Sequence, residues 1–123
     1  MTKLDFASMS DRDLVDLFVQ IGIEQDDSLN GPGVARYNRL FKQETALLDE
    51  LKSRDGDRRT LLLALYNHQN MQVRLNAAKA TLAIAPVAAR QQLELIRASR
   101  YQPQAGDAGM SIWALDEGIY KPE

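Results

Sequence analysis

The sequence predicts an all-α fold, a short right-handed stack of about three helical hairpins built from about six helices. Apolar residues recur at helical spacing, as at Val73, Ala77, Ala80 and Ile84. No segment alternates apolar and polar residues between hairpin turns, as the strands of a half-buried sheet do. A weak echo relates residues 61–64 to residues 93–96, which lie 32 positions later. A repeat of this period in helical pairs is typical of stacked helical arrays.

The composition indicates one domain over residues 1–123. The chain has no cysteine, so we expect neither disulfides nor thiolate metal sites, and a reducing, cytoplasmic location fits. The first residues lack the basic and apolar regions of a signal peptide, and no apolar run is long enough for a bilayer. The net charge of −2 disfavours a general nucleic-acid binder, which usually has a strongly basic face. We expect no cofactor, no bound metal and no membrane partner.

The first helix has a recognisable start. Ser10 and Asp13 have the spacing of a capping box, with Asp in place of the usual Glu. They predict a helix over about residues 11–24. A loop over residues 26–33 follows, because Gly31-Pro32-Gly33 interrupts any regular element.

A second, longer helix is predicted from Val34 to about Arg54, where Gly56 can end it in the left-handed conformation. Asp57 can cap a third helix, and a turn over residues 67–70 leads into a fourth that carries the Val73 line. We expect the apolar face of the second helix to consist of Val34, Tyr37, Phe41, Leu48 and Leu51, with Leu40 and Leu47 beside it.

The last two helices follow a proline and a polar connector. Pro86 suits the first turn of a fifth helix, and residues 101–106 form the connector. Asp107 can then cap a short sixth helix over about residues 108–117, and Gly118 fits the left-handed residue that follows a helix. The large apolar side chains at this end are expected to close the core, namely Met110, Trp113 and Ile119.

Two resemblances support this interpretation. Val73-Arg74 followed by Ala77-Ala78 and Leu82 resembles the second helix of a HEAT repeat, a likeness over about residues 57–99. The turn of a HEAT repeat usually contains an aspartate that contacts the arginine of the neighbouring repeat. Residues 67–70 contain no carboxylate, so we expect Arg74 to be available for another partner. The chain is also similar to a small bacterial family, domain of unknown function 2019. That likeness lies in residues 73–78, 105–110 and 115–122, and it implies a HEAT/ARM-like helical fold and no activity.

Charge is distributed unevenly along the chain. Residues 1–27 hold seven acidic side chains against two basic ones, whereas residues 70–106 hold one acid against five Arg or Lys. In a stacked array the second helices of the hairpins line one surface. Here that surface would be basic, and we expect it to bind an acidic or amphipathic segment of a partner protein. The candidate contact residues are Arg36, Arg39, Lys42, Arg74 and Lys79.

The sequence therefore favours a non-enzymatic protein-interaction module, and self-association would bring its two charged ends together. One alternative is an immunity- or antitoxin-like protein that masks a toxic enzyme through Asp11, Asp13, Asp16, Asp26 and Asp27. Another is a small DNA- or nucleotide-binding protein, in which Trp113 and Tyr101 stack on bases while Arg97 and Arg100 meet phosphate. A buried Trp113 that closes the core is the ordinary alternative to stacking.

The titratable clusters do not indicate catalysis or metal binding. His68 lies in a turn with no catalytic motif around it, so a solvated or capping role is expected. Residues 26–30 offer oxygen ligands without the spacing of a calcium loop. Asp116 and Glu117 are adjacent, and adjacent helical residues do not face each other as an acid–base pair must. We predict no catalytic residue.

Overall fold

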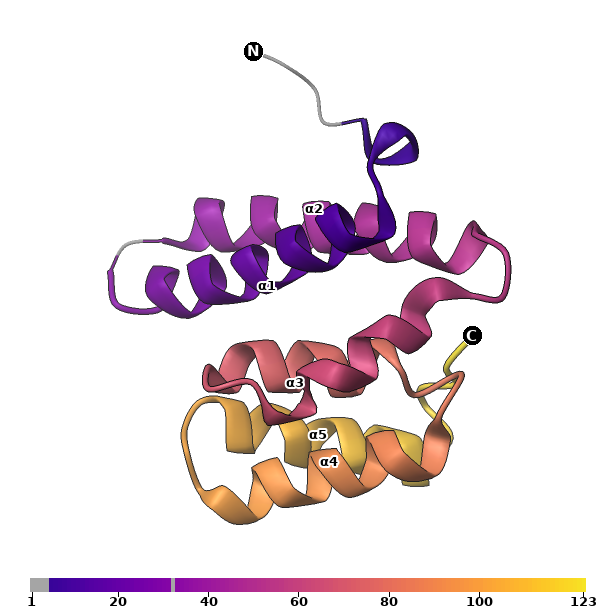
Figure 1. Cartoon of the computed structure of the whole chain (residues 1–123). Helices are drawn as coiled ribbons and strands as arrows, with labels where there is room; N and C mark the ends of the chain where they lie inside the picture. The colour runs from indigo at the N-terminus through magenta and orange to yellow at the C-terminus, as the bar shows by residue number, and fades with distance from the viewer. Residues whose placement is uncertain (1–4, 32) are drawn as a thin grey trace. The chain divides into compact units, whose positions relative to one another are not determined.

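Figure 1 shows the computed structural model, which describes residues 5–31 and 33–123 and contains helices and connecting segments but no strand in these ranges. The all-α prediction is confirmed. The chain divides into two compact units, unit 1 (Met1–Leu61) and unit 2 (Leu62–Glu123), and each is described by itself. The elements are α1 (Asp11–Ser28), α2 (Val34–Ser53), α3 (Met71–Ala80), α4 (Pro86–Ser99) and α5 (Gln104–Asp116), with the 3-10 helices η1 (Phe6–Ser8) and η2 (Arg58–Asn67).

Unit 1 is built on the hairpin of α1 and α2. The predicted cap is confirmed, because the Ser10 hydroxyl accepts a hydrogen bond from the Asp13 backbone N–H at 3.1 Å. The helix continues four residues beyond the expected end at Glu24, to Ser28. The added turn buries Gln25, whose side-chain amide donates to Glu44 on α2 at 3.2 Å. A polar contact between helices therefore extends α1 where the sequence suggested a loop.

The buried face of α2 differs from the predicted one. Leu40, Glu44, Leu47 and Leu51 are buried, at helical spacings of four, three and four. Val34 is 76% exposed and Phe41 is 55% exposed, although both were expected to face inward. Because Glu44 finds an amide partner on α1, a carboxylate can occupy the inward stripe. The buried face is thus rotated around the helix axis relative to the face that was predicted from the apolar residues alone.

Arg54 ties the segment before α1 to the end of α2. Its guanidinium donates to the carboxylates of Asp11 and Glu50, both at 2.8 Å. It also donates to the backbone carbonyls of Phe6 at 3.0 Å and Met9 at 2.6 Å. One planar cation with several donors thereby fixes η1, the start of α1 and the last turn of α2.

Unit 2 is a cluster in which α3 packs against both α4 and α5, which also pack against each other. The small residues Ala77 and Ala78 on α3 are fully buried and allow close approach of the neighbouring helices. Tyr66 of η2 packs against the same core as Leu115 of α5. The buried residues of this core are Leu75, Ala78, Leu82, Ala89, Leu93, Ile96, Ala108 and Ile112.

Buried amides join α3 to α5. The Gln104 side-chain amide donates to Gln72 at 3.0 Å, and that of Gln72 donates to Asn76 at 2.9 Å. The sixth predicted helix therefore begins at Gln104 rather than near Ala108. The side chain of Gln102 also accepts from the backbone N–H of Gly106 at 3.0 Å, so Gln102 satisfies a donor of the first turn, and Asp107, expected to cap the helix, lies inside it.

The third predicted helix forms in part. Residues 58–67 adopt a 3-10 helix, and Leu62 is its buried residue. Asp57, with a positive φ of 53°, accepts from the backbone N–H of Arg59 at 3.3 Å and binds the Arg59 guanidinium at 2.6 Å. Hydrogen bonding to Arg59 lowers the pKa of Asp57. The expected cap is thus present, on a tighter helix.

The end of α5 is partly as expected. Gly118 has a φ of 68° and donates to the Leu115 carbonyl at 3.2 Å, while Ile119 donates to the Ala114 carbonyl at 3.0 Å. This pair of bonds is a Schellman motif, so the predicted helix end is confirmed. The expected burial of the large side chains is wrong, because Met110 is 64%, Trp113 is 50% and Ile119 is 65% exposed. Smaller residues, Ala105, Ala108 and Ile112, occupy the inward face instead.

Candidate functional site

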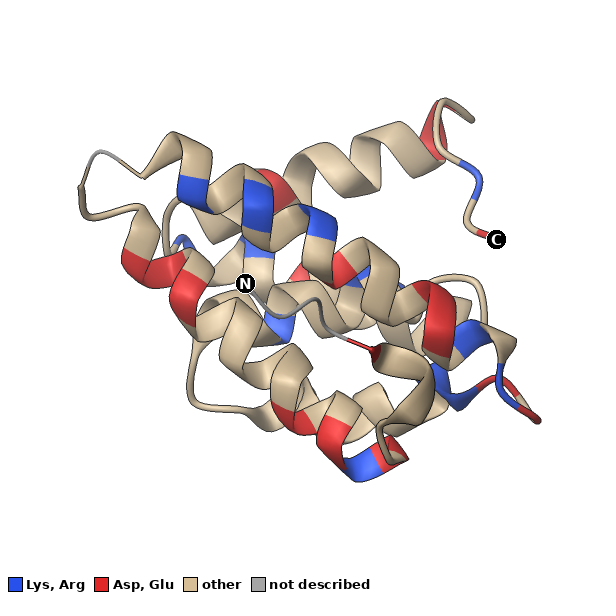
Figure 2. Cartoon of the chain, turned by 90° about the horizontal axis from the view of Figure 1, so that it is seen from above, with Lys and Arg blue, Asp and Glu red and all other residues tan. Residues whose placement is uncertain are grey.

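The predicted basic residues of unit 1 differ in their surroundings. Arg36 forms ion pairs with Asp27 at 3.0 Å and Glu24 at 3.7 Å, both on α1. Arg39 and Lys42 are exposed one turn further along α2, and neither forms an ion pair with a described residue. Figure 2 shows the acidic segments of α1 and the basic segments of α2 on this hairpin. The hairpin thus neutralises Arg36 and leaves Arg39 and Lys42 as the cations available to a partner.

The two predicted basic residues of unit 2 are engaged within that unit. Arg74 donates from its Nε to the backbone carbonyl of His68, so it finds a partner in the turn itself. His68 in turn accepts from the backbone N–H of Asn70 through Nδ1 at 3.0 Å, a bond within the turn before α3 rather than a cap on the preceding helix. Lys79 pairs with Asp107 on α5 at 3.0 Å. Arg74 therefore has a structural role despite the missing HEAT aspartate.

The acidic residues proposed for an immunity-like contact also divide into two groups. Asp11 pairs with Arg54 at 2.8 Å and with Arg58 at 3.4 Å. Asp13 and Asp16 are exposed on α1, and within the described residues neither forms an ion pair. The structure thus leaves two carboxylates of α1, spaced one turn apart, open to a partner.

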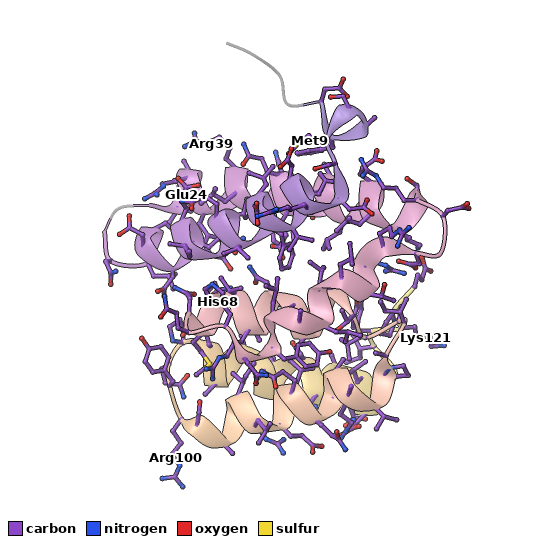
Figure 3. All side chains as sticks on the ribbon, in the orientation of Figure 1. Met9, Glu24, Arg39, His68, Arg100 and Lys121 are labelled. Carbon is purple, nitrogen blue, oxygen red and sulfur yellow. The ribbon has the colours of Figure 1, made fainter. Side chains whose placement is uncertain are left out.

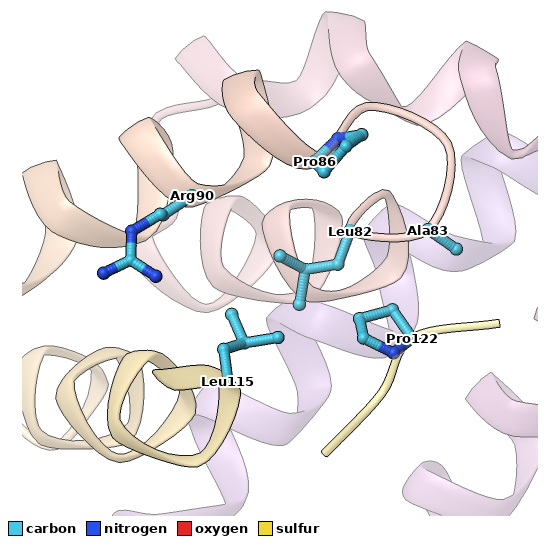
Figure 4. Close-up of a pocket in the computed structure, with 6 residues that line it drawn as sticks. All are labelled: Leu82, Ala83, Pro86, Arg90, Leu115 and Pro122. Atoms are coloured by element: carbon cyan, nitrogen blue, oxygen red, sulfur yellow. The ribbon is translucent and has the colours of Figure 1, made fainter. Parts of the chain in front are cut away.

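Figure 4 shows a pocket in unit 2 whose lining comes from the α3–α4 connection, α4, α5 and the C-terminal segment. Arg90, its charged lining residue, makes a bidentate contact with Asp116 at 2.7 and 3.1 Å and binds Glu94 at 3.1 Å. This hydrogen bonding lowers the pKa of Asp116. With Arg90 already paired, the pocket offers mainly an apolar notch formed by Leu82, Ala83, Pro86, Leu115 and Pro122.

The outward side of α5 carries two large exposed apolar side chains. Met110 and Trp113 are three residues apart and therefore adjacent on one helix face. Ile119 and Tyr120 follow, and both donate backbone hydrogen bonds to the Ala114 carbonyl, which folds them back against the helix end. We call these four exposed residues, Met110, Trp113, Ile119 and Tyr120, the α5 surface. Contiguous exposed apolar residues of this kind mark interaction sites.

Two cations lie at the end of α4, and one of them, Arg97, contacts α5. The aliphatic part of Arg97 crosses α5 at Gly109, where an added Cβ would lie 3.5 Å from Arg97 Cδ. Gly109 lies one turn before Trp113, so Arg97 lies on the face of α5 that carries Trp113. Arg100, in the left-handed conformation at the end of α4, projects away from the helices (Figure 3). Within the described ranges neither arginine forms an ion pair.

Comparison with known proteins identifies the family. The model for the family described as "Domain of unknown function (DUF2019)" matches residues 12–116. The chain belongs to this family. Its fold is similar to that in the crystal structure of the protein RPA1889 from Rhodopseudomonas palustris CGA009, with 56% sequence identity and a TM-score of 0.94 over 98% of this chain and 100% of that one. No curated protein matches the chain.

The DUF2019 chain shows no cluster of metal-binding side chains in its described residues. The same residues contain no helix that is both long and apolar enough to cross a bilayer. The α5 surface was missed by sequence reasoning because aromatic and Met residues at helical spacing are usually buried. A signal was present in the sequence. The small residues Ala105, Gly106, Ala108 and Gly109 precede Met110, and a helix that packs through small residues has a narrow inward face. Such a face leaves little room for Met110 and Trp113 inside.

Proposed function

We propose that this DUF2019 chain is a non-enzymatic protein-interaction module that docks an acidic or amphipathic segment of a protein. The observation that carries the proposal is the α5 surface, in which a half-exposed Trp113 lies beside Met110 and the unpaired Arg97. Tryptophan, methionine and arginine are the side chains enriched at the centres of protein interfaces. An apolar surface with a basic rim fits an apolar stripe with an acidic border.

Arg39 and Lys42 of α2 are a secondary contact in this proposal, since they are the two predicted cations of unit 1 with no intramolecular carboxylate in the described residues. Arg36, Arg74 and Lys79 would contribute only by giving up the contacts they already make. The proposal also includes HEAT-like stacking of the helical hairpins. The absence of cysteine supports a cytoplasmic location for the module.

Affinity capture tests the proposal. The immobilised chain and its Met110→Ala/Trp113→Ala variant are incubated with lysate of the native host at low and high salt, and retained proteins are identified. Val87→Ala/Leu95→Ala is the matched control, because both residues are exposed apolar positions on α4. We expect a protein that the wild type and the control retain and the α5-surface variant loses.

The captured protein is then purified and titrated against the wild-type chain. Trp113 is the only tryptophan, so its emission reports directly on the α5 surface. A shift to shorter wavelength on binding supports docking over Trp113, because the indole leaves water. Retention that does not depend on Met110 and Trp113, or no retained protein at all, overturns the proposal.

A second candidate function is binding of single-stranded nucleic acid. The observation that favours it is the exposure of Trp113 and Tyr101 in a unit that also has two arginines without an ion pair among the described residues, Arg97 and Arg100. Bases stack on exposed aromatic side chains, and phosphates pair with arginine. Titration of the chain with a single-stranded oligonucleotide would quench Trp113 emission and weaken steeply with salt if this function is correct. An unchanged emission at low salt would exclude it.

A third candidate is an immunity- or antitoxin-like role, in which the chain masks a partner enzyme. The observation that favours it is the pair of exposed carboxylates on α1, Asp13 and Asp16, which have no ion-pair partner among the described residues. In that case the captured protein is an enzyme that the chain inhibits, and Asp13→Arg/Asp16→Arg abolishes both capture and inhibition. Inhibition that survives this double substitution would remove the α1 contact.

A further inference from the structure

We propose that the segment docked on the α5 surface is helix α1 of a second copy of this chain. This inference rests on the proposed function, because it takes the α5 surface as an interaction surface and specifies its occupant. The occupant must supply apolar contact for Met110 and Trp113 and a carboxylate for Arg97. Among the described helices, the outward side of α1 combines those two properties.

The outward side of α1 carries carboxylates that the hairpin does not use. Asp13 and Asp16 are exposed, lie one turn apart and have no ion-pair partner among the described residues. Asp11, Glu24 and Asp27 are by contrast paired with arginines of unit 1. These anions are complementary to Arg97, a cation in the last turn of α4 that forms no ion pair with a described residue.

The same side of α1 also carries apolar surface. Ile23 lies seven residues after Asp16, which places both on one helix face, and Ile23 is 36% exposed. Val19, half-buried, lies between them along the helix. An isoleucine and a valine bordered by carboxylates are complementary to a tryptophan and a methionine bordered by an arginine. Arg12 is the basic residue at the N-terminal edge of this face.

The net charges of the two units also favour contact between α1 of one copy and unit 2 of another. Residues 1–61 contain 12 acidic and nine basic side chains, whereas residues 62–123 contain five acidic and six basic ones. Unit 1 is therefore net negative and unit 2 is slightly positive at neutral pH. Attraction between unlike units of two copies would favour their encounter, and it would weaken as salt screens exposed charges.

Sedimentation of the purified full chain tests the inference. We expect the average mass to rise with protein concentration at low salt, to fall at high salt, and Trp113 emission to shift to shorter wavelength as the mass rises. The variants Asp13→Arg/Asp16→Arg and Arg97→Glu/Arg100→Glu should each weaken self-association by at least about tenfold, since each places like charges across the contact.

Mixing the two variants gives the decisive result. The basic α1 of the first variant can dock on the acidic rim of the second, and the acidic α1 of the second can dock on the basic rim of the first. We therefore expect the mixture to recover the mass of the wild type. The matched control is Asp49→Arg/Asp55→Arg, which reverses two exposed charges of unit 1 that have no part in the proposed contact. Circular dichroism establishes that all variants are folded.

Three outcomes would overturn the inference: a wild-type chain that stays monomeric at low salt, self-association that survives both charge variants, or a mixture that stays monomeric. A monomeric chain that still captures another protein through Met110 and Trp113 would overturn this inference and leave the proposed function standing. Loss of both would remove the proposed function as well.

Discussion

The two units use their charged side chains differently. In unit 1, Arg54 gathers two carboxylates and two backbone carbonyls, and Arg36 pairs with two acids of α1. In unit 2, buried amides join α3 to α5 beside an apolar core, the ion pairs of Arg90 and Lys79 are partly exposed, and Met110 and Trp113 are exposed on α5. The comparison shows that part of the acidic charge of residues 1–27 is used within the first hairpin, where Asp11, Glu24 and Asp27 pair with arginines, whereas unit 2 exposes large apolar side chains.

The largest expected effect concerns the core of unit 2. Leu93 is fully buried on α4, so Leu93→Ala should lower the free energy of unfolding by about 3 kcal/mol, through lost apolar burial and the cavity that remains. Urea denaturation followed by Trp113 emission measures the loss. Leu95→Ala, an exposed leucine on the same helix, is the control and should change stability by less than about 0.5 kcal/mol. Equal effects would contradict the assignment of the core.

The next effect concerns the ionic contacts of unit 1. Arg54→Ala should lower the melting temperature clearly, because it leaves Asp11, Glu50 and the carbonyls of Phe6 and Met9 without their common donor. Arg58→Ala is the matched control, since Arg58 is half-exposed and makes a single 3.4 Å contact with Asp11. Melting followed by circular dichroism should show a much smaller shift for this control. Similar shifts would mean that Arg54 is no more than a surface cation.

A smaller effect is expected at Tyr66. The Thr81 hydroxyl donates to the Ala77 carbonyl at 2.8 Å, so the Tyr66 hydroxyl is the donor in its 2.5 Å contact with Thr81. Tyr66→Phe should therefore lower stability by about 1 kcal/mol at neutral pH. Urea denaturation at pH 7 measures this change, and an unchanged stability would contradict the assignment.

The pH dependence of the same residue sharpens the test. Burial raises the pKa of Tyr66. A pKa that is higher in the folded state gives stabilisation that is complete below the unfolded value, about 10, and is lost as pH rises through the folded value. The wild type should therefore lose more stability between neutral and strongly alkaline pH than Tyr66→Phe does. Parallel pH profiles for the two proteins would show that Tyr66 titrates as an exposed phenol.

The smallest effect on stability is expected at the α5 surface. Met110→Ala/Trp113→Ala should change the free energy of unfolding by less than about 1 kcal/mol, because both side chains are at least half exposed. Urea denaturation followed by circular dichroism measures it, since this variant lacks the fluorescent residue. A loss as large as that of Leu93→Ala would place both side chains in the core and would remove the basis of the proposed contact.

Much of the helical content could be predicted from the sequence. The Ser10 cap, the Pro86 start of α4 and the Gly118 end of α5 are local signals, and the structure confirms each of them. The added turn of α1 and the early start of α5 were missed, because they depend on Gln25 reaching Glu44 and Gln104 reaching Gln72. The sequence does not show which residue of another helix a glutamine side chain will bind.

The candidate site was less predictable than the fold. Formal charge identified Arg36, Arg39, Lys42, Arg74 and Lys79 together, but it cannot show that Asp27, Asp107 and a backbone carbonyl already engage three of them. Residue type also suggested that Trp113 is buried, although the inward face of α5 is already filled by Ala105, Ala108 and Ile112.

The sequence by itself determined that this chain forms helices, where most of them begin and end, and that its charge is uneven, because caps, prolines, glycines and apolar periodicity act within a few residues. Only the tertiary structure decided which face of α2 turns inward, which cations are neutralised and that Met110 and Trp113 lie outside. These properties depend on which helix packs against each face. The apolar periodicity of a helix predicts that it has a buried face, but it does not predict which element packs there.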